Sequence, residues 1–512
     1  MVKIKFYSIL FLFSVVIFIS FLRLGSPTLF DVDEAVFAEA TKEMVQSGDW
    51  ITPTYNGENR YDKPIFFYWL MAASYKVFGV SEFGARFPSA LLGLMLCTAV
   101  YFFVKHFQGE RNALYAVIAL SLSIFFVAYS HAAVTDMALT FFMTLSLFSF
   151  YYSLKKNKFI YGFYVFSALA FLTKGLIGIV FPFGIAIVYL ITTEGLSGVK
   201  RVFNFKGTAL FCLISAPWYV AQTVVNGQEF VRQFFLKHHF VRYTGVISGH
   251  RGPVYYYIPV LIIGLFPWIT FLPAGIRHAF KEKDDLNLFA LIWFGAVVSF
   301  FTFSTTKLPN YVLPAIPAAA IMIASGMSDP NIRWRKYSNI CVAAISLSLA
   351  VTLLVLKKYL LKVNVYDMDW TFMAAAIIFS LTIVGIYAAF ARKTLYVPIS
   401  CIMFLFLTIL SVKALPIVNR HLQGTLYKYS LYAGQAAQGD DRIITYGLNN
   451  PSIVFYSGHK VLNTRNKNEL LPYITSGKGR IAIAKVKDIE ALRNLNFNLL
   501  ESDGTYAILE RK

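Results

Sequence analysis

The chain has 512 residues, of which 57% are hydrophobic and only 14% are charged, and its mean hydropathy is +0.58. This composition excludes a soluble globular protein and is typical of a membrane protein with several spans. The net charge of +20 would suit nucleic-acid binding, but the cytoplasmic loops of membrane proteins collect the same basic excess.

The first apolar run extends from Phe6 to Leu22 and follows Lys3 and Lys5. A cleaved signal peptide would need a pattern of small residues after such a run, and none precedes Arg23. We therefore expect a retained first span.

A long polar stretch, Asp31 to Pro88, comes next and is the candidate active site. Its first half predicts a helix that has Asp31 or Asp33 as its N-cap and ends at Gly48 in a left-handed turn. The helix should be amphipathic and lie on the membrane, with Val36, Phe37, Ala40 and Met44 on one side and Glu39, Lys42, Glu43 and Gln46 on the other. At the helix start, Asp33 would be an ionised carboxylate, ready to act as a base or a ligand.

The second half of the stretch opens with Asp62-Lys63-Pro64 and continues as an apolar run to Val77. Proline in a first turn followed by apolar residues predicts another juxtamembrane helix. The alternative is that the charges of this stretch only solvate a surface loop.

About 13 spans are expected in all, because the rest of the chain up to residue 412 holds apolar segments near the length that crosses a bilayer. They are residues 86–104, 112–130, 133–154, 159–172, 175–192, 207–225, 254–275, 286–303, 309–326, 337–356, 371–390 and 394–412. The short pair 159–172 and 175–192 could instead be one re-entrant unit, so the count has a margin of two. Lysine and arginine gather in alternate loops, such as 155–158 and 333–336. This asymmetry predicts a cytoplasmic N-terminus and makes nucleic-acid binding a remote reading.

The opposite, outward side receives two long loops, 25–85 and 226–253, in which we expect juxtamembrane helices within a transmembrane domain of residues 1–412. Residues 413–512 differ in kind. They read as a small outward α/β domain, with strands in RIITYG, IVFYSG, RIAIAKV and YAILER and a helix in DIEALRNL.

Ionisable residues elsewhere map to the outward side. Asp136 lies just inside a span, where a charge is by default a functional candidate, although it could instead pair with Lys174 of a neighbouring span. A phosphate at headgroup level could be bound by five side chains that offer cations and a phenol, namely Lys63, Arg242, Arg251, Lys307 and Tyr311. The loop histidines His238, His239 and His250 could bind zinc or manganese with a carboxylate, but their spacing is not a metal-binding motif.

Outward carboxylates beside a basic cluster, without a cytosolic nucleotide site, favour an enzyme that takes an activated substrate such as a polyprenyl-phosphate sugar from the lipid phase. The segments that carry a family resemblance are Asp33–Glu39, Ser47–Trp50, Asp62–Pro64, Tyr68–Leu70, His250–Pro253, Tyr256–Pro259 and Lys307–Pro314. Together they resemble the lipid A aminoarabinose transferases of the protein O-mannosyltransferase-like superfamily. The resemblance covers nearly the whole chain and implies the C-type glycosyltransferase (GT-C) fold with a periplasmic α/β domain.

The resemblance also implies roles for individual residues. Asp33 matches the essential acid of the family, and Asp136 matches a second acid. Lys63, Arg251 and Tyr311 look like the groups that hold the polyprenyl phosphate. The family usually has Glu-Lys-Pro where this chain has Asp62-Lys63-Pro64, which puts in doubt a metal held between Asp62 and a loop histidine, either His250 or His238.

The expected function is transfer of a sugar, 4-amino-4-deoxy-L-arabinose or a related one, from undecaprenyl phosphate to lipid A in the bacterial inner membrane. The displacement would be single and inverting, and membrane lipids would surround the enzyme. One alternative is transfer to another glycolipid, a polysaccharide or a protein hydroxyl. Another is a lipid-sugar transporter, which should show repeats and charges at the bilayer midplane instead of at one face.

Overall fold

The computed structural model describes residues 6–234, 252–281, 284–362, 369–391, 395–439 and 441–511. Its contacts divide the chain into two compact units. The membrane unit consists of Met1–Leu22, Tyr61–Phe67 and Arg86–Ala414, and the sheet unit consists of Arg23–Arg60, Tyr68–Ala85 and Leu415–Lys512. The sheet unit therefore combines most of the first outward loop with the C-terminal tail, which the expected domains 1–412 and 413–512 had separated.

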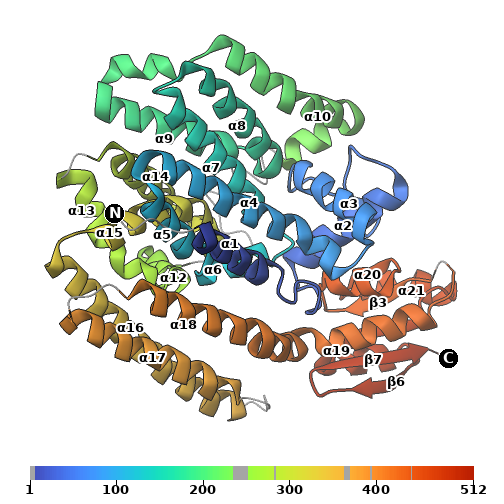
Figure 1. The fold of residues 1–512 in the computed structure, drawn as a ribbon. Coiled ribbons are helices and arrows are strands. Elements are labelled where there is room, and N and C mark those ends of the chain that lie inside the picture. The colour runs from blue at the N-terminus through green and yellow to red at the C-terminus, as the bar shows by residue number, and fades with distance from the viewer. Residues whose placement is uncertain are drawn as a thin grey trace. The chain divides into compact units, whose positions relative to one another are not determined.

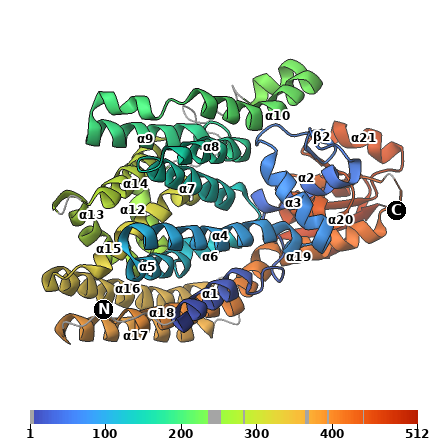
Figure 2. The ribbon, with the colours of Figure 1, turned by 45° about the horizontal axis from the view of Figure 1, so that its top comes forward.

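The membrane unit is built from helices (Figures 1 and 2). They are α1 (Phe6–Phe21), α4 (Glu82–Gln108, whose first turn belongs to the sheet unit), α5 (Glu110–Ser121), α6 (Ile124–Ser130), α7 (Thr135–Ser153), α8 (Ile160–Lys174), α9 (Ile177–Glu194), α10 (Phe205–Val231), α12 (Tyr257–Gly264), α13 (Leu272–Lys281), α14 (Asp285–Phe303), α15 (Ile316–Ser328), α16 (Ile332–Lys362), α17 (Trp370–Ala391) and α18 (Tyr396–Ile409). In both views α7, α8 and α9 lie side by side, as do α16 and α17.

The described residues contain 8 helices long and apolar enough to cross a membrane, or up to 10 if each of two bent pairs is one span. The expected count of about 13 is not confirmed. One expected span, α1, has 16 residues, which is short of the ~20 that cross a bilayer.

Two of the expected spans are broken. Residues 254–275 form two helical segments that meet at 107°, and residues 112–130 form α5 and α6, which meet at 63°. Pro267 lies at the first break, where a proline cannot continue a helix. The two breaks support each other, because the indole of Trp268 donates to the carbonyl of Leu122 over 3.1 Å. A buried carbonyl released by one break thus keeps a partner.

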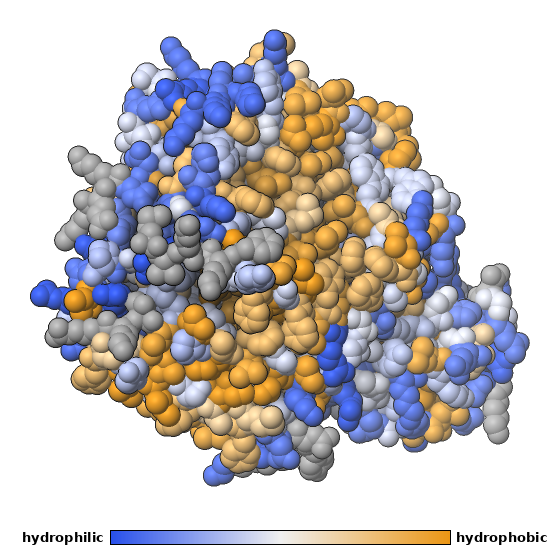
Figure 3. All heavy atoms as spheres, in the orientation of Figure 1, coloured by the Kyte–Doolittle hydropathy of each residue, from blue (hydrophilic) through white to orange (hydrophobic). Residues whose placement is uncertain are grey.

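Apolar side chains remain exposed along the helices of this unit. On α16 and α17 they include Val351, Val355, Phe372, Ile383 and Phe390, each more than half exposed. Figure 3 shows apolar side chains spread broadly over the face that it displays. Exposure on this scale is costly in water and expected in lipid, so these helices face the bilayer.

The sheet unit begins with α2 (Asp33–Ser47), the hairpin of β1 (Thr54–Tyr55) and β2 (Glu58–Asn59), and most of α3 (Phe66–Phe78). Asn56 and Gly57 form the hairpin turn, with φ of 57° and 78°, which suits an Asn-Gly pair. The predicted second helix is present as α3, but it begins at Phe66, so Pro64 precedes it and is not in its first turn. The predicted first helix is also confirmed, and it ends at Gly48 in the left-handed region.

Two expectations about α2 are wrong. Its N-cap is Val32, without a side-chain capping bond, so neither Asp31 nor Asp33 caps it. Its apolar face does not lie on lipid, because Val36, Phe37, Ala40 and Met44 are buried, and the Phe37 ring packs on Tyr68 within the sheet unit. Glu39 is buried as well, although it was expected on the polar side.

The tail forms a mixed five-stranded sheet in the order β4-β3-β5-β7-β6. Strands β3 (Ile443–Tyr446), β4 (Val461–Thr464) and β5 (Ile481–Lys485) are parallel, while β7 (Tyr506–Arg511) and β6 (Phe497–Ser502) complete the sheet in antiparallel pairs. Helices α19 (Leu415–Ala436) and α20 (Pro451–Ser457) pack on one face, and α21 (Lys467–Thr475) and α22 (Ile489–Arg493) pack on the other. The expected α/β domain is confirmed.

One tail segment differs from its prediction. IVFYSG was expected as a strand and is most of helix α20. Pro451 stands in the first turn, where proline favours a helix, and Gly458 ends the helix with φ of 69°. These local signals outweigh the β-propensity of the intervening apolar residues.

Candidate active site

Asp33 is the first residue of α2, and its side chain is exposed. Among the described residues, none forms a hydrogen bond or ion pair with its carboxylate. The neighbouring acids are engaged in holding the structure. Asp31 bonds to the start of α20, and Glu34 accepts from the backbone N–H of Phe30 over 3.0 Å. The stretch thus presents one unengaged carboxylate at the N-terminus of a helix.

Further along α2, Glu39 forms an ion pair with Lys42 at 3.0 Å. Burial raises the pKa of Glu39 above its ordinary value, while the Lys42 ammonium acts in the opposite direction. Lys42 also donates to the carbonyl of Phe455 in α20 over 3.3 Å. Glu39 therefore belongs to the interior of the sheet unit and is not a second exposed acid beside Asp33.

Asp62 and Lys63 lie in the membrane unit. The Lys63 ammonium is 3.9 Å from the Asp62 carboxylate and donates to the carbonyl of the same residue over 3.2 Å. Both side chains are partly buried, with 24% and 17% of their surface exposed. The proposed contact of Lys63 with a phosphate stays a prediction from the sequence.

Asp136 stands in the first turn of α7 and is almost fully buried. Its Oδ1 atom is 2.6 Å from the ammonium of Lys174, the last residue of α8, and accepts from the side-chain amide of Asn310 over 3.0 Å. The pairing with Lys174 considered from the sequence is therefore formed. This pair does not exclude a catalytic role, since a buried charge needs a partner in either case.

Tyr311 follows Asn310 in the 3-10 helix η6 (Pro309–Ala315). The Lys174 ammonium lies 6.0 Å from the centre of its ring, and the ring also packs on Phe301. The structure thus brings Asp136, Lys174, Asn310 and Tyr311 together. Sequence reasoning treated Lys174 only as a possible partner and missed Asn310. The sequence did hold a signal for Lys174. Asp136 and Lys174 are both isolated charges within apolar spans, and such charges are stable when they pair with each other.

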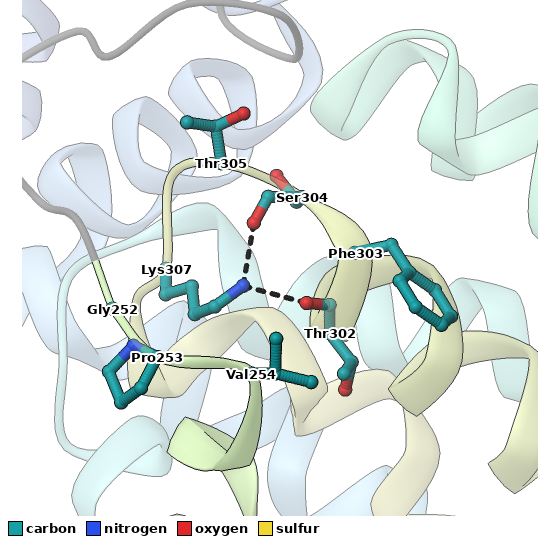
Figure 4. A pocket seen from close by; sticks show the side chains of 8 residues that line it. All are labelled: Gly252, Pro253, Val254, Thr302, Phe303, Ser304, Thr305 and Lys307. Carbon is teal, nitrogen blue, oxygen red and sulfur yellow. Dashed lines mark hydrogen bonds between the residues drawn. The ribbon is translucent and has the colours of Figure 1, made fainter.

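Lys307 lies in the loop between α14 and η6, and its ammonium is directed back toward the end of α14 (Figure 4). It donates to the carbonyls of Ser304 and Thr302 over 2.6 and 2.8 Å, with a longer contact of 3.5 Å to Phe301. Desolvation lowers the pKa of this lysine from its ordinary value. Through these hydrogen bonds, the Lys307 ammonium satisfies carbonyls at the C-terminal end of α14 that have no partner within the helix.

An open pocket of about 490 Å³ adjoins Lys307 (Figure 4). Its other lining residues come from the end of α14 with the loop after it and from the start of η4 (Val254–Tyr256) with the segment before it, namely Gly252, Pro253, Val254, Thr302, Phe303, Ser304 and Thr305. A side chain at Gly252 would meet the Lys307 stem at 2.9 Å, so glycine allows the two segments to approach.

Replacing Lys307 with methionine is expected to lower stability by ~1–3 kcal/mol, because the carbonyls at the end of α14 lose their donor. Thermal unfolding in detergent measures this. Lys358→Met is the matched control, since Lys358 is an exposed lysine of α16. An unchanged unfolding temperature together with weaker donor binding would contradict this role and make Lys307 a phosphate ligand.

Several predicted site residues, Arg242, Arg251, His238, His239 and His250, lie outside the described residues. Within the described ranges, no three side chains of His, Cys, Asp or Glu gather as a metal-binding group. Asp62 has the Lys63 cation beside it, which opposes a divalent ion. The described residues therefore do not by themselves fit the expected zinc or manganese site.

Comparison with known proteins agrees with this organisation. Residues 62–220 match the family model described as dolichyl-phosphate-mannose-protein mannosyltransferase. An uncharacterised protein of Aquifex aeolicus is 32% identical over 347 residues, which are 67% of this chain and 68% of that protein. The undecaprenyl phosphate-alpha-4-amino-4-deoxy-L-arabinose arabinosyl transferase of Yersinia pestis is 30% identical over 343 residues, 64% of this chain and 60% of that protein.

Among solved structures, ArnT from Cupriavidus metallidurans bound to undecaprenyl phosphate matches with a TM-score of 0.83 and 22% identity. The match covers 98% of both chains. The fold therefore extends over the membrane helices and the C-terminal sheet alike.

Proposed function

Given that the chain belongs to the aminoarabinose transferase-like family of GT-C glycosyltransferases, we propose that it moves a sugar from undecaprenyl phosphate to lipid A. The sugar is 4-amino-4-deoxy-L-arabinose or a related one. The observation that carries the proposal is the exposed Asp33 carboxylate, which is unengaged in the described residues while Asp31 and Glu34 beside it are used to hold the structure.

The reaction is a single displacement at the anomeric carbon. An acceptor oxygen forms a bond to that carbon, the bond from the carbon to the phosphate oxygen breaks, and undecaprenyl phosphate leaves with the electron pair. Inversion of the anomeric centre follows from one displacement. Only one acid is required, unlike the two carboxylates of a retaining glycosidase.

The leaving phosphate gains negative charge as the bond breaks, so cations placed around it lower the barrier. Lys63 is the described candidate cation, Tyr311 is a described candidate hydrogen-bond donor, and Arg242 and Arg251 are the candidate cations in the outer loop. Lys307 was proposed from the sequence for the same role, but its donors already serve backbone carbonyls.

Asp33 takes the proton of the acceptor if the acceptor is a hydroxyl. If the acceptor is a lipid A phosphate, no base is needed and Asp33 positions the acceptor or a metal. An unengaged carboxylate therefore also suits a second candidate function. In that function the acceptor is a hydroxyl of another glycolipid, a polysaccharide or a protein. We assign Asp136 to the same reaction, as an acid whose charge Lys174 balances.

The protein is a multi-pass membrane protein, and we place it in the bacterial inner membrane. In this proposal its N-terminus is cytoplasmic and its sheet unit periplasmic, which the lysines and arginines of alternate loops support. A metal held by Asp62 and His250 stays a hypothesis. Loss of transfer on chelation, reversed by zinc or manganese, would support it.

Transfer to lipid A is expected when the purified wild-type protein in membranes receives undecaprenyl-phosphate aminoarabinose. Donors with other pentoses and with hexoses define the sugar, and mass spectrometry of the product identifies the position modified. Transfer only to hydroxyl acceptors would favour the second candidate function. No binding of any undecaprenyl-phosphate sugar would overturn the proposal.

A further inference from the structure

The segment that leads into α2 is held by side chains from the C-terminal part of the sheet unit. Thr28 and Asn419 of α19 exchange three hydrogen bonds, each of 3.1 Å, and the backbone N–H of Leu29 donates to the Tyr456 hydroxyl over 2.7 Å. Residues separated by about 400 positions in sequence thus fix the backbone just before the candidate catalytic acid.

Asp31 forms the densest of these contacts. Its Oδ1 accepts from the backbone N–H of Ser452 over 2.8 Å. Its Oδ2 accepts from the Ser452 hydroxyl over 2.7 Å and from the Asn450 side-chain amide over 2.9 Å. With its amide oriented so that both atoms are satisfied, Gln423 of α19 adds a bond of 3.1 Å to Oδ2 and one of 3.2 Å from the Asp31 N–H. We call Asp31, Gln423, Asn450 and Ser452 the Asp31 clamp.

The Asp31 clamp provides a hydrogen-bond acceptor for the first turn of helix α20. The first turn of a helix has backbone N–H groups without partners, and a side chain at the N-cap usually accepts from one of them. Asn450 is the N-cap of α20, but its side chain makes no capping bond. Asp31 supplies the acceptor instead, and its negative charge suits the positive end of the helix. Ser452 is only 2% exposed, so water competes little for these bonds.

The clamp also fixes Asp33. Only Val32 separates the two aspartates, and the turn between them is held by the bond from Phe30 N–H to Glu34 and by a bond of 3.4 Å from Ala35 N–H to the Phe30 carbonyl. The Asp33 carboxylate is exposed and has no bonding partner among the described residues. Its place is therefore set by the backbone, which the clamp holds.

We propose that Asp31, Asn450 and Ser452 are positioning residues for the transfer reaction, through which the C-terminal α/β part of the chain sets the location of Asp33. The inference rests on the proposed function, in which Asp33 acts on the acceptor. It gives the α/β tail a role in the reaction itself.

The test uses Asp31→Ala and the milder Ser452→Ala in the full-length protein, in membranes. Asp31→Ala removes every bond of the carboxylate, whereas Ser452→Ala removes one and leaves the backbone N–H in place. We expect kcat to fall about 10- to 100-fold for Asp31→Ala and less for Ser452→Ala, because small displacements of a reacting group are costly. The KM for the donor should stay within about twofold of wild type, since the residues proposed for its phosphate belong elsewhere in the chain.

Hydrogen exchange of residues 26–36 gives a readout that does not depend on activity. Both variants should exchange faster there than wild type. Lys428→Ala is the matched control, because it breaks an exposed ion pair with Glu501 in the same unit, 2.5 Å long, and should change neither kcat nor exchange at the start of α2. Unchanged exchange, or faster exchange with an unchanged kcat, would overturn the inference. So would a fall in kcat matched by an equal loss of folded protein.

Failure of the proposed function would look different. A wild-type protein without any sugar transfer would refute that function and, with it, the catalytic meaning of the clamp. Faster exchange in Asp31→Ala would then still show that the clamp holds the start of α2, without a transfer reaction for it to serve.

Discussion

Replacing Asp33 with alanine is expected to reduce sugar transfer to a hydroxyl acceptor by at least about a hundredfold while the protein stays folded. General-base catalysis contributes roughly 10²- to 10⁴-fold, and Asp33 is the one acid at the start of α2 without a bonding partner in the described residues. Its side chain is exposed and does not cap the helix, so little stability depends on it. Transfer of radiolabelled sugar in membranes measures the effect.

Asp33→Asn separates two roles of this residue. Asparagine keeps the shape and one acceptor but removes the charge, so it should be as inactive as alanine if Asp33 takes a proton. Glu490→Ala is the control, because Glu490 is an exposed acid of α22 in the same unit. Full activity of Asp33→Ala toward lipid A would mean that the anionic acceptor needs no base, and full activity toward every acceptor would remove Asp33 from the mechanism.

Replacing Asp136 with asparagine is expected to abolish transfer and to destabilise the membrane unit by about 3–5 kcal/mol, the cost of leaving one partner of a buried ion pair alone. The Lys174 ammonium, 2.6 Å away and with 14% of its side chain exposed, would have no compensating charge among the described residues. Thermal unfolding in detergent and the transfer assay measure the two effects separately.

The double variant Asp136→Asn with Lys174→Met distinguishes structure from chemistry. Removing both charges should recover most of the stability, since neither partner is left buried and alone. Transfer that stays absent in this stable double variant would confirm Asp136 as part of the reaction. Transfer that returns with stability would show that the ion pair only holds α7 against α8. Arg201→Met, which breaks an exposed pair with Glu194, serves as the control for loss of a salt bridge.

The sequence predicted most elements that follow from local patterns. Apolar runs of span length located the membrane helices, and Gly48 located the end of α2. Predictions from local patterns were wrong where a proline or glycine signal competed with an apolar run. Pro451 and Gly458 turned an apolar strand-like segment into α20, and Pro267 broke an expected span. The number of spans could not be settled, because hydropathy does not register a bend inside an apolar run.

For the residues of the candidate site, too, the sequence determined one part and the tertiary structure determined the rest. Composition and residue pattern alone determined a multi-pass membrane protein with a polar first loop rich in acids and bases and an α/β tail, since these depend on which residues are present and how they repeat. Only the tertiary structure decided which acids are engaged. The sequence singled out Asp33 by its place at the helix start and by the family resemblance, but it did not show which of Asp31, Asp33 and Glu34 have bonding partners. Partners about 420 residues away occupy Asp31, a neighbouring backbone N–H occupies Glu34, and Asp33 has none among the described residues. The contact of Glu34 is local, whereas the contacts of Asp31 are long-range and no local pattern encodes them.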